Sequence, residues 1–177
     1  MKRTLLIMSP SRVSSTCVER ALAASERAGS ELAVVYILDA TLADDVQERI
    51  QDFGFVGDVP SARFLEAVRE EHRRRGEAEL GRIAVLAEAR GVSVSVELVV
   101  GEFLRLSLAA AERIAPSEIF VARQDRPALS RLVIGSDVKR LARDASCDVN
   151  VYRAGDRDPG SRRDSDSGGR ENGSEGT

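Results

Sequence analysis

Short, almost continuously apolar segments alternate along the chain with longer segments in which apolar residues recur every three or four positions. The first pattern is typical of strands buried on both faces of a parallel sheet, and the second of helices that pack with one face. We therefore predict five strands, at residues 4–8, 32–38, 92–100, 119–122 and 149–152. Helices are expected between them, the first from Ser14 or Ser15 to residue 28 and the others at residues 61–90, 104–115 and 136–145.

Strands that alternate with helices indicate right-handed crossovers and a parallel sheet covered on both faces, so the predicted fold class is α/β.

The ends of the first helix have local signals. Ser14 or Ser15 is suited to cap its start, and Gly29 to end it. In the long second helix, Gly76 and Gly81 are expected to weaken the middle, because glycine is a poor helix former.

The last 23 residues differ sharply in composition from the rest. Residues 155–177 contain no aliphatic or aromatic side chain apart from one proline. Such a segment cannot bury enough apolar surface to offset the entropy of ordering it. We predict one folded domain at residues 1–154 and a disordered polar tail at residues 155–177, either an interaction arm or a solubilising tail.

Charge and cysteine content narrow the class of protein. The net charge of −3 gives no basic excess for binding nucleic acid or an anionic membrane. The N-terminal apolar run is too short for a signal peptide, and no segment reaches the roughly 20 apolar residues of a membrane-spanning helix. Cys17 and Cys147 both lie in patterns typical of packed side chains, which favours reduced thiols. We expect a cytoplasmic protein with neither a membrane nor a nucleic-acid partner.

Ligands of an open parallel sheet bind beyond the carboxyl ends of its strands. The segments that follow the predicted strands therefore supply the candidate binding residues, which are Ser9, Gly101, Ala122, Arg123, Arg126, Gly135 and Ser136. The arginines lie in a loop beside the Gly135-Ser136 helix start, a combination that favours anions such as phosphate. Solvated arginines on a charged surface loop are the alternative interpretation.

No catalytic constellation is found in the sequence. The single histidine, His72, excludes a site of several histidines and has no cysteine or acid arranged for nucleophilic work. The motifs of phosphate-binding loops, dinucleotide-binding loops and nucleophile elbows are absent from the sequence. We therefore expect no enzyme, no catalytic residues and no metal site.

Three segments carry a family resemblance. Residues 129–136 read Leu-Ser-Arg-Leu-Val-Ile-Gly-Ser, residues 141–147 read Leu-Ala-Arg-Asp-Ala-Ser-Cys before the last strand, and residues 99–101 read Val-Val-Gly before a helix. With the order of predicted elements, they make residues 2–154 resemble the universal stress protein family. The resemblance implies a three-layer α/β/α sandwich of Rossmann-like type. It also implies a five-stranded sheet in the order 3-2-1-4-5, and dimerisation.

The sequence departs from that family at its ligand site. Nucleotide-binding members carry Gly-x2-Gly-x9-Gly-(Ser/Thr), and here Ala122 and Asp125 occupy the first two glycine positions before Gly135-Ser136. A side chain blocks the close backbone approach that glycine allows, and a carboxylate at position 125 repels phosphate. The aspartate that such members place after the first strand, against adenine, aligns with Ser9.

Three functions follow from this combination. The first is a regulatory or interaction domain with a degenerate nucleotide site, no tight ATP binding and no cofactor. The second is a nucleotide sensor that binds ATP or AMP in a rearranged pocket, and the third is an enzyme of the wider adenine-nucleotide hydrolase-like group. The apolar residues of the last strand, on an exposed sheet edge, predict a homodimer through Val149, Val151 and Tyr152.

Overall fold

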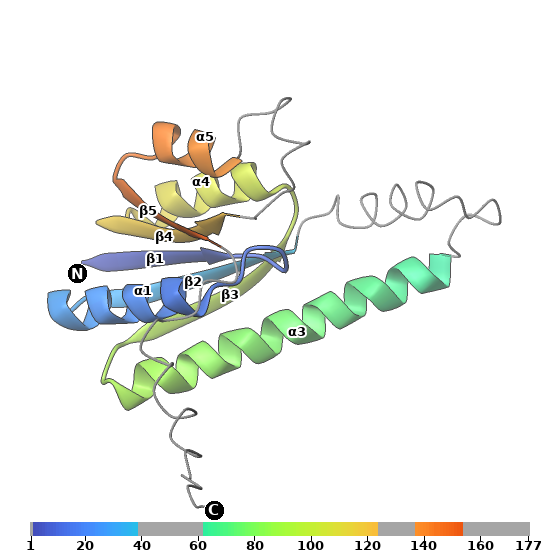
Figure 1. Ribbon diagram of the computed structural model, residues 1–177, viewed down its shortest axis with the longest axis horizontal. Coiled ribbons are helices and arrows are strands. Elements are labelled where there is room, and N and C mark those ends of the chain that lie inside the picture. Colours follow the sequence, from blue (N-terminus) through green and yellow to red (C-terminus); the bar gives the residue numbers. More distant parts are fainter. Residues whose placement is uncertain (1, 39–61, 124–136, 154–177) are drawn as a thin grey trace, which may run out of the picture.

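Five parallel strands form the centre of the molecule (Figure 1). The computed structural model describes residues 2–38, 62–123 and 137–153. The sheet has the order β3-β2-β1-β4-β5, which confirms the predicted order. The strands are β1 (Arg3–Met8), β2 (Glu31–Leu38), β3 (Val94–Val100), β4 (Glu118–Arg123) and β5 (Asp148–Arg153).

Helices cover both faces of the sheet, so the predicted α/β/α layers are confirmed (Figure 1). Helices α1 (Ser15–Ala28) and α3 (Ala62–Ala89) pack on one face, and α4 (Phe103–Ile114) and α5 (Asp137–Asp144) on the other. Alternate strand residues separate the two cores, since Leu6 faces α1 and α3 while Leu5 and Ile7 face α4 and α5. The predicted domain boundary at residue 154 and the tail 155–177 lie outside the described residues.

The ends of α1 follow the predicted local signals. The Ser14 hydroxyl accepts a hydrogen bond from the Cys17 backbone N–H at 3.3 Å, so Ser14 is the N-cap. Gly29 has a φ of 57° and donates its backbone N–H to the Glu26 carbonyl at 3.3 Å. This left-handed conformation is the one that glycine adopts without steric cost. The start and the stop of α1 are therefore both set locally.

Gly76 has a packing role that differs from the predicted weak point in α3. A Cβ atom at this position would lie 2.8 Å from Cε1 of Tyr36 and 3.0 Å from Cδ1 of Leu98. Glycine therefore lets the helix approach β2 and β3 closely enough for the Tyr36 ring to lie against its backbone. The loss of helix propensity at residue 76 is offset by this close contact.

The two halves of α3 lie in different surroundings. The C-terminal half buries Leu80, Ile83 and Ala87 in the core, whereas the N-terminal half extends beyond the sheet (Figure 1). There Glu71 accepts hydrogen bonds from Arg74 and Arg75, which lower the pKa of its carboxyl to about 2. Such pairs three and four residues apart stabilise the exposed face of a helix.

Within the described residues, no helix is long and apolar enough to cross a membrane. The same part of the chain contains no group of three or more His, Cys, Asp or Glu side chains able to hold a metal ion.

Candidate functional site at the carboxyl ends of the strands

The junction of β1 and β4 is the point where the strand order reverses. From β1 the chain proceeds to β2 and β3 on one side, and β4 and β5 lie on the other. Strands β1 and β4 pair directly, with Ile7 opposite Val121. Ligands of open α/β sheets bind at such a point, beyond the carboxyl ends of the strands, and we refer to this place as the crevice.

A buried arginine lies on the β1 side of this junction. After β1 the chain turns back at residues 9–12, where the Arg12 backbone N–H donates to the Ser9 carbonyl at 2.9 Å. The turn brings the Arg12 guanidinium over Ser9, whose hydroxyl accepts from Nη1 at 3.4 Å. Only 8% of Arg12 is exposed and only 1% of Ser9. Arginine is rarely this buried unless its charge is paired.

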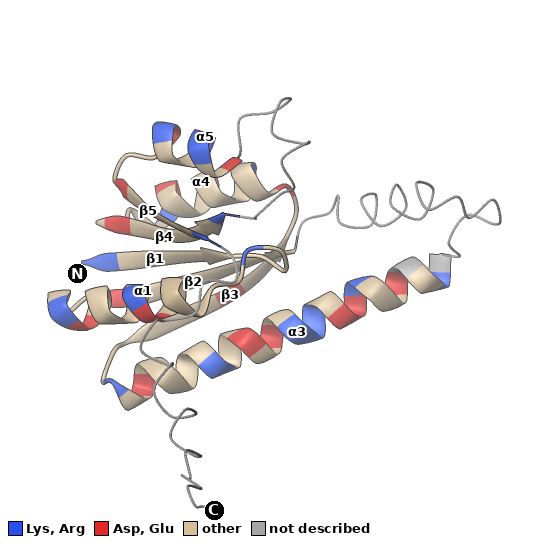
Figure 2. Cartoon of the chain, in the orientation of Figure 1, with Lys and Arg blue, Asp and Glu red and all other residues tan. Residues whose placement is uncertain are grey.

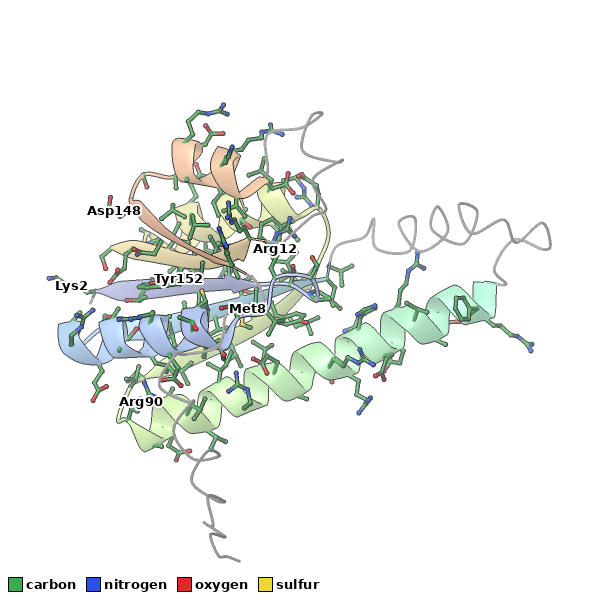
Figure 3. The ribbon with its side chains drawn as sticks, viewed as in Figure 1. Lys2, Met8, Arg12, Arg90, Asp148 and Tyr152 are labelled. Atoms are coloured by element: carbon green, nitrogen blue, oxygen red, sulfur yellow. The ribbon has the colours of Figure 1, made fainter. Side chains whose placement is uncertain are left out.

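Two helices supply the partners of the Arg12 charge. Nη2 donates to Oδ2 of Asp137, the first residue of α5, at 3.2 Å. The guanidinium also lies over the ring of Phe103, the first residue of α4, at 3.9 Å from the ring centroid. Arg12 therefore joins the β1 turn to the starts of α4 and α5, the two helices that share one face of the sheet (Figure 3). The ion pair and the cation–π contact offset part of the loss of hydration of the guanidinium.

The described structure places three of the predicted site residues at the ends of two neighbouring strands. Ser9 and Arg123 each lie two residues beyond the Ile7–Val121 pair, and the buried Ala122 directly precedes Arg123 on β4. Gly101 lies apart, because it follows β3 and is separated from β1 by the whole of β2. The predicted residues Arg126, Gly135 and Ser136 lie outside the described residues, as does Asp125.

Gly101 has a backbone role. Its φ is 154°, a value that side-chain-bearing residues rarely adopt, and a Cβ there would lie 3.0 Å from Cδ1 of Leu106. Its N–H donates to the Leu38 carbonyl at 3.0 Å, which joins the exits of β2 and β3. These contacts account for glycine at residue 101 without a ligand.

A second group of arginines lies at the outer end of the same sheet edge. Arg123 and Arg153 are paired in register at the ends of β4 and β5, where basic positions colour both strand ends blue (Figure 2). Both are exposed. With Val151 and Tyr152 they line an open hollow of about 470 Å³. Neighbouring strands are roughly 4.8 Å apart, so two like charges meet here.

The remaining candidate groups are packed side chains. Burial raises the pKa of the Cys17 thiol to about 12, and burial also raises the pKa of Cys147. Neither thiol is therefore activated as a nucleophile. His72 is half-buried on α3, and its pKa is lowered mainly by burial and also by the charge of Arg75. The arrangement of these described groups offers no acid–base pair.

Comparison with known proteins decides the family. The sequence model of the Universal stress protein family matches residues 1–153. The chain belongs to the universal stress protein family. No curated protein sequence matches the chain significantly.

Solved structures of universal stress proteins share the fold. Universal stress protein UspA from Lactobacillus plantarum is 14% identical, with a TM-score of 0.64 over 86% of this chain and 97% of its own. A family member from Burkholderia pseudomallei is 20% identical, with a TM-score of 0.59 over 86% and 96%. A universal stress protein from Archaeoglobus fulgidus, solved in complex with dAMP, is 12% identical, with a TM-score of 0.51 over 86% and 100%.

Arg12 is the site residue that sequence reasoning missed in this universal stress protein. It stands in a Ser-Pro-Ser-Arg turn, where an arginine is ordinarily solvated. Its ion-pair partner Asp137 is 125 residues further along the chain. The only local signal is the position itself, directly after a strand that ends at the crevice.

Proposed function

We propose that this chain is a regulatory or interaction domain of the universal stress protein family with a degenerate nucleotide site. The observation that supports it is Ser9, at the position that the family resemblance assigns to an adenine-contacting aspartate. Its side chain is buried, and its hydroxyl is engaged by Arg12 of the same chain. A neutral, internally bonded hydroxyl is a poorer partner for the adenine amino group than a free carboxylate.

A structural relative favours testing adenine nucleotides first. The Archaeoglobus fulgidus protein was solved with dAMP, so a nucleotide complex exists on this fold. The freshly purified protein should be titrated by calorimetry with Mg-ATP, ADP and AMP, and its denatured supernatant analysed by mass spectrometry. We expect no heat of binding at millimolar ligand and no copurified nucleotide. Micromolar binding or a released nucleotide would replace this proposal with the second candidate.

The second candidate is a nucleotide sensor that binds ATP or AMP in a rearranged pocket. The observation that favours it is the exposed pair Arg123 and Arg153 beside the hollow, since two adjacent guanidinium groups attract phosphate. The residues proposed to bind are Arg123, Arg126, Gly135 and Ser136. An Arg123→Ala variant should then lose most of the nucleotide affinity, whereas the degenerate-site proposal expects no affinity to lose.

The proposal includes the absence of catalysis. The described residues offer no activated thiol, and no hydrogen bond joins His72 to an acidic side chain among them, although the charge of the neighbouring Glu71 raises its pKa slightly against the larger effect of burial. Incubation with Mg-ATP at millimolar concentration should release no phosphate above the buffer rate. Phosphate release that disappears in a single-site variant would contradict the proposed absence of catalysis.

We also propose that the protein is a homodimer through β5. This strand ends the sheet, and Val151 on it is 43% exposed, while Val149 and Tyr152 are half-buried. The Tyr152 ring stacks on Phe120 at 6.2 Å between centroids, which fixes it against the sheet. An apolar edge strand of this kind favours pairing with a second copy.

Opposite edges of the sheet provide a matched test of the dimer. Val96 on edge strand β3 is 45% exposed, close to the value for Val151. Val151→Lys should shift the sedimentation coefficient from dimer to monomer, while Val96→Lys should leave the dimer intact. The reverse result would place the interface on β3, and no change in either variant would exclude both edges.

A further inference from the structure

Arg12 contacts more than Ser9, the residue that stands where the family resemblance places an aspartate. Its guanidinium is held on three sides, by the Ser9 hydroxyl, the Asp137 carboxylate and the Phe103 ring. These partners come from the exit of β1 and from the starts of α4 and α5. These contacts place the side chain beside the junction where the strand order reverses, the place at which ligands of open α/β sheets bind.

We propose that Arg12 is an internal occupant of the crevice between β1 and β4 and that it excludes adenine nucleotides from it. This inference rests on the proposed function and adds a cause to it. An incoming nucleotide has to displace a guanidinium that is 8% exposed and to break its contacts with three partners. Release of Arg12 also leaves the Ser9 hydroxyl without this donor, so both groups lose the free energy of a buried hydrogen bond.

Charge adds a second barrier to a nucleotide. The Asp137 carboxylate is 34% exposed and is neutralised by Arg12. A phosphate that reached the crevice would compete with this carboxylate for the guanidinium and would be repelled by it. Around Arg12, two changes would therefore admit a nucleotide more readily, the removal of the Arg12 side chain and the removal of the Asp137 charge.

A pair of double variants separates volume from charge. Arg12→Ala with Asp137→Asn empties the space and removes both charges. Arg12→Met with Asp137→Asn removes the same charges but keeps an unbranched side chain over the Phe103 ring, so it serves as the matched control. Both should show the circular dichroism spectrum of the wild-type protein before they are titrated with AMP.

We expect AMP to bind the Ala/Asn variant at least about tenfold more tightly than the Met/Asn variant or the wild-type protein. Equal affinity of the two double variants would overturn the inference, because the volume of the side chain would then not matter. No binding by a folded Ala/Asn variant would overturn it as well. AMP binding by the wild-type protein is a different outcome, which refutes the degenerate-site proposal itself.

A measurement on the wild-type protein keeps the inference testable if the Ala/Asn variant does not fold. In a sample labelled with ¹⁵N arginine, the Arg12 side-chain signals should show slow rotation of the guanidinium, as expected for a group held on three sides. They should not move when millimolar AMP is added. A shift of these signals on titration would overturn the inference, because Arg12 would then be a receptor for the nucleotide phosphate.

Discussion

Two sets of arginines lie at the same edge of the sheet and have opposite surroundings. Arg12, at the β1–β4 junction, is enclosed by Ser9, Phe103 and Asp137. Arg123 and Arg153, at the ends of β4 and β5, are exposed beside an open hollow. The enclosed guanidinium already has its anion and its aromatic partner within the chain. Residue type and position at the ligand edge are therefore insufficient to identify a binding residue.

The enclosed and the exposed arginines should also contribute differently to the stability of the fold. A buried ion pair is sensitive to the loss of one partner, because the other charge is then left without compensation. Exposed arginines of like charge gain little from each other, and their removal costs almost nothing. Substitutions at the two places should therefore change the free energy of unfolding by different amounts, whether or not a ligand binds.

The largest expected effect is that of Arg12→Ala. It removes an ion pair, a cation–π contact and the packing of the aliphatic stem, so we expect a loss of about 3 kcal/mol in the free energy of unfolding. Arg123→Ala is the control and should change this free energy by less than about 0.5 kcal/mol. Urea unfolding followed by circular dichroism measures both. Equal effects of the two substitutions would show that the enclosure of Arg12 contributes no stability.

Phe103→Leu should have the next largest effect. The ring is buried, and its loss removes the surface under the guanidinium while leaving an apolar side chain, so we expect about 2 kcal/mol of destabilisation. In an Arg12→Met background the same substitution should cost about 1 kcal/mol less, because no cation remains to be lost. A cost that is the same in both backgrounds would assign the whole effect to packing.

Asp137→Asn should cost less than either. Its carboxylate is partly exposed and also lies in the first turn of α5, where a negative charge is favourable, so we expect a loss of about 1 kcal/mol. Combination with Arg12→Met should recover part of this loss, since an uncharged pair leaves no buried cation unpaired. If the losses of the two single variants simply add, the two side chains are not coupled in the folded protein.

The sequence was sufficient for features that depend on neighbours in the chain. Ser14 and Gly29 were identified as candidates for the ends of α1 because a cap is a contact over three or four residues. The buried strands were visible as apolar runs. The packing role of Gly76 was not predicted, because its neighbours Tyr36 and Leu98 come from two different strands.

The candidate site was predicted less completely than the fold. Its place at the carboxyl ends followed from strand order, and Ser9, Ala122 and Arg123 lie at the ends of β1 and β4. Arg12 was not found, since its burial depends on Phe103 and Asp137, which approach only when α4 and α5 pack on the sheet. A contact that spans most of the chain has no periodicity, and pattern analysis therefore does not detect it.

The smallest expected effect concerns the exposed arginines. Arg123 and Arg153 are adjacent in register and carry like charges, so a divalent anion between them should relieve their repulsion. Sulfate at fixed ionic strength should therefore stabilise the wild-type protein more than an Arg123→Ala/Arg153→Ala variant, by about 0.5 kcal/mol beyond its general effect on both.

Arg12→Met is the matched control and should keep the full sulfate response. Thermal unfolding in sulfate and in chloride measures the difference. An equal response of the wild-type protein and the double variant would show that the exposed pair does not hold anions, and a response that depends on Arg12 would place the anion in the enclosed crevice instead.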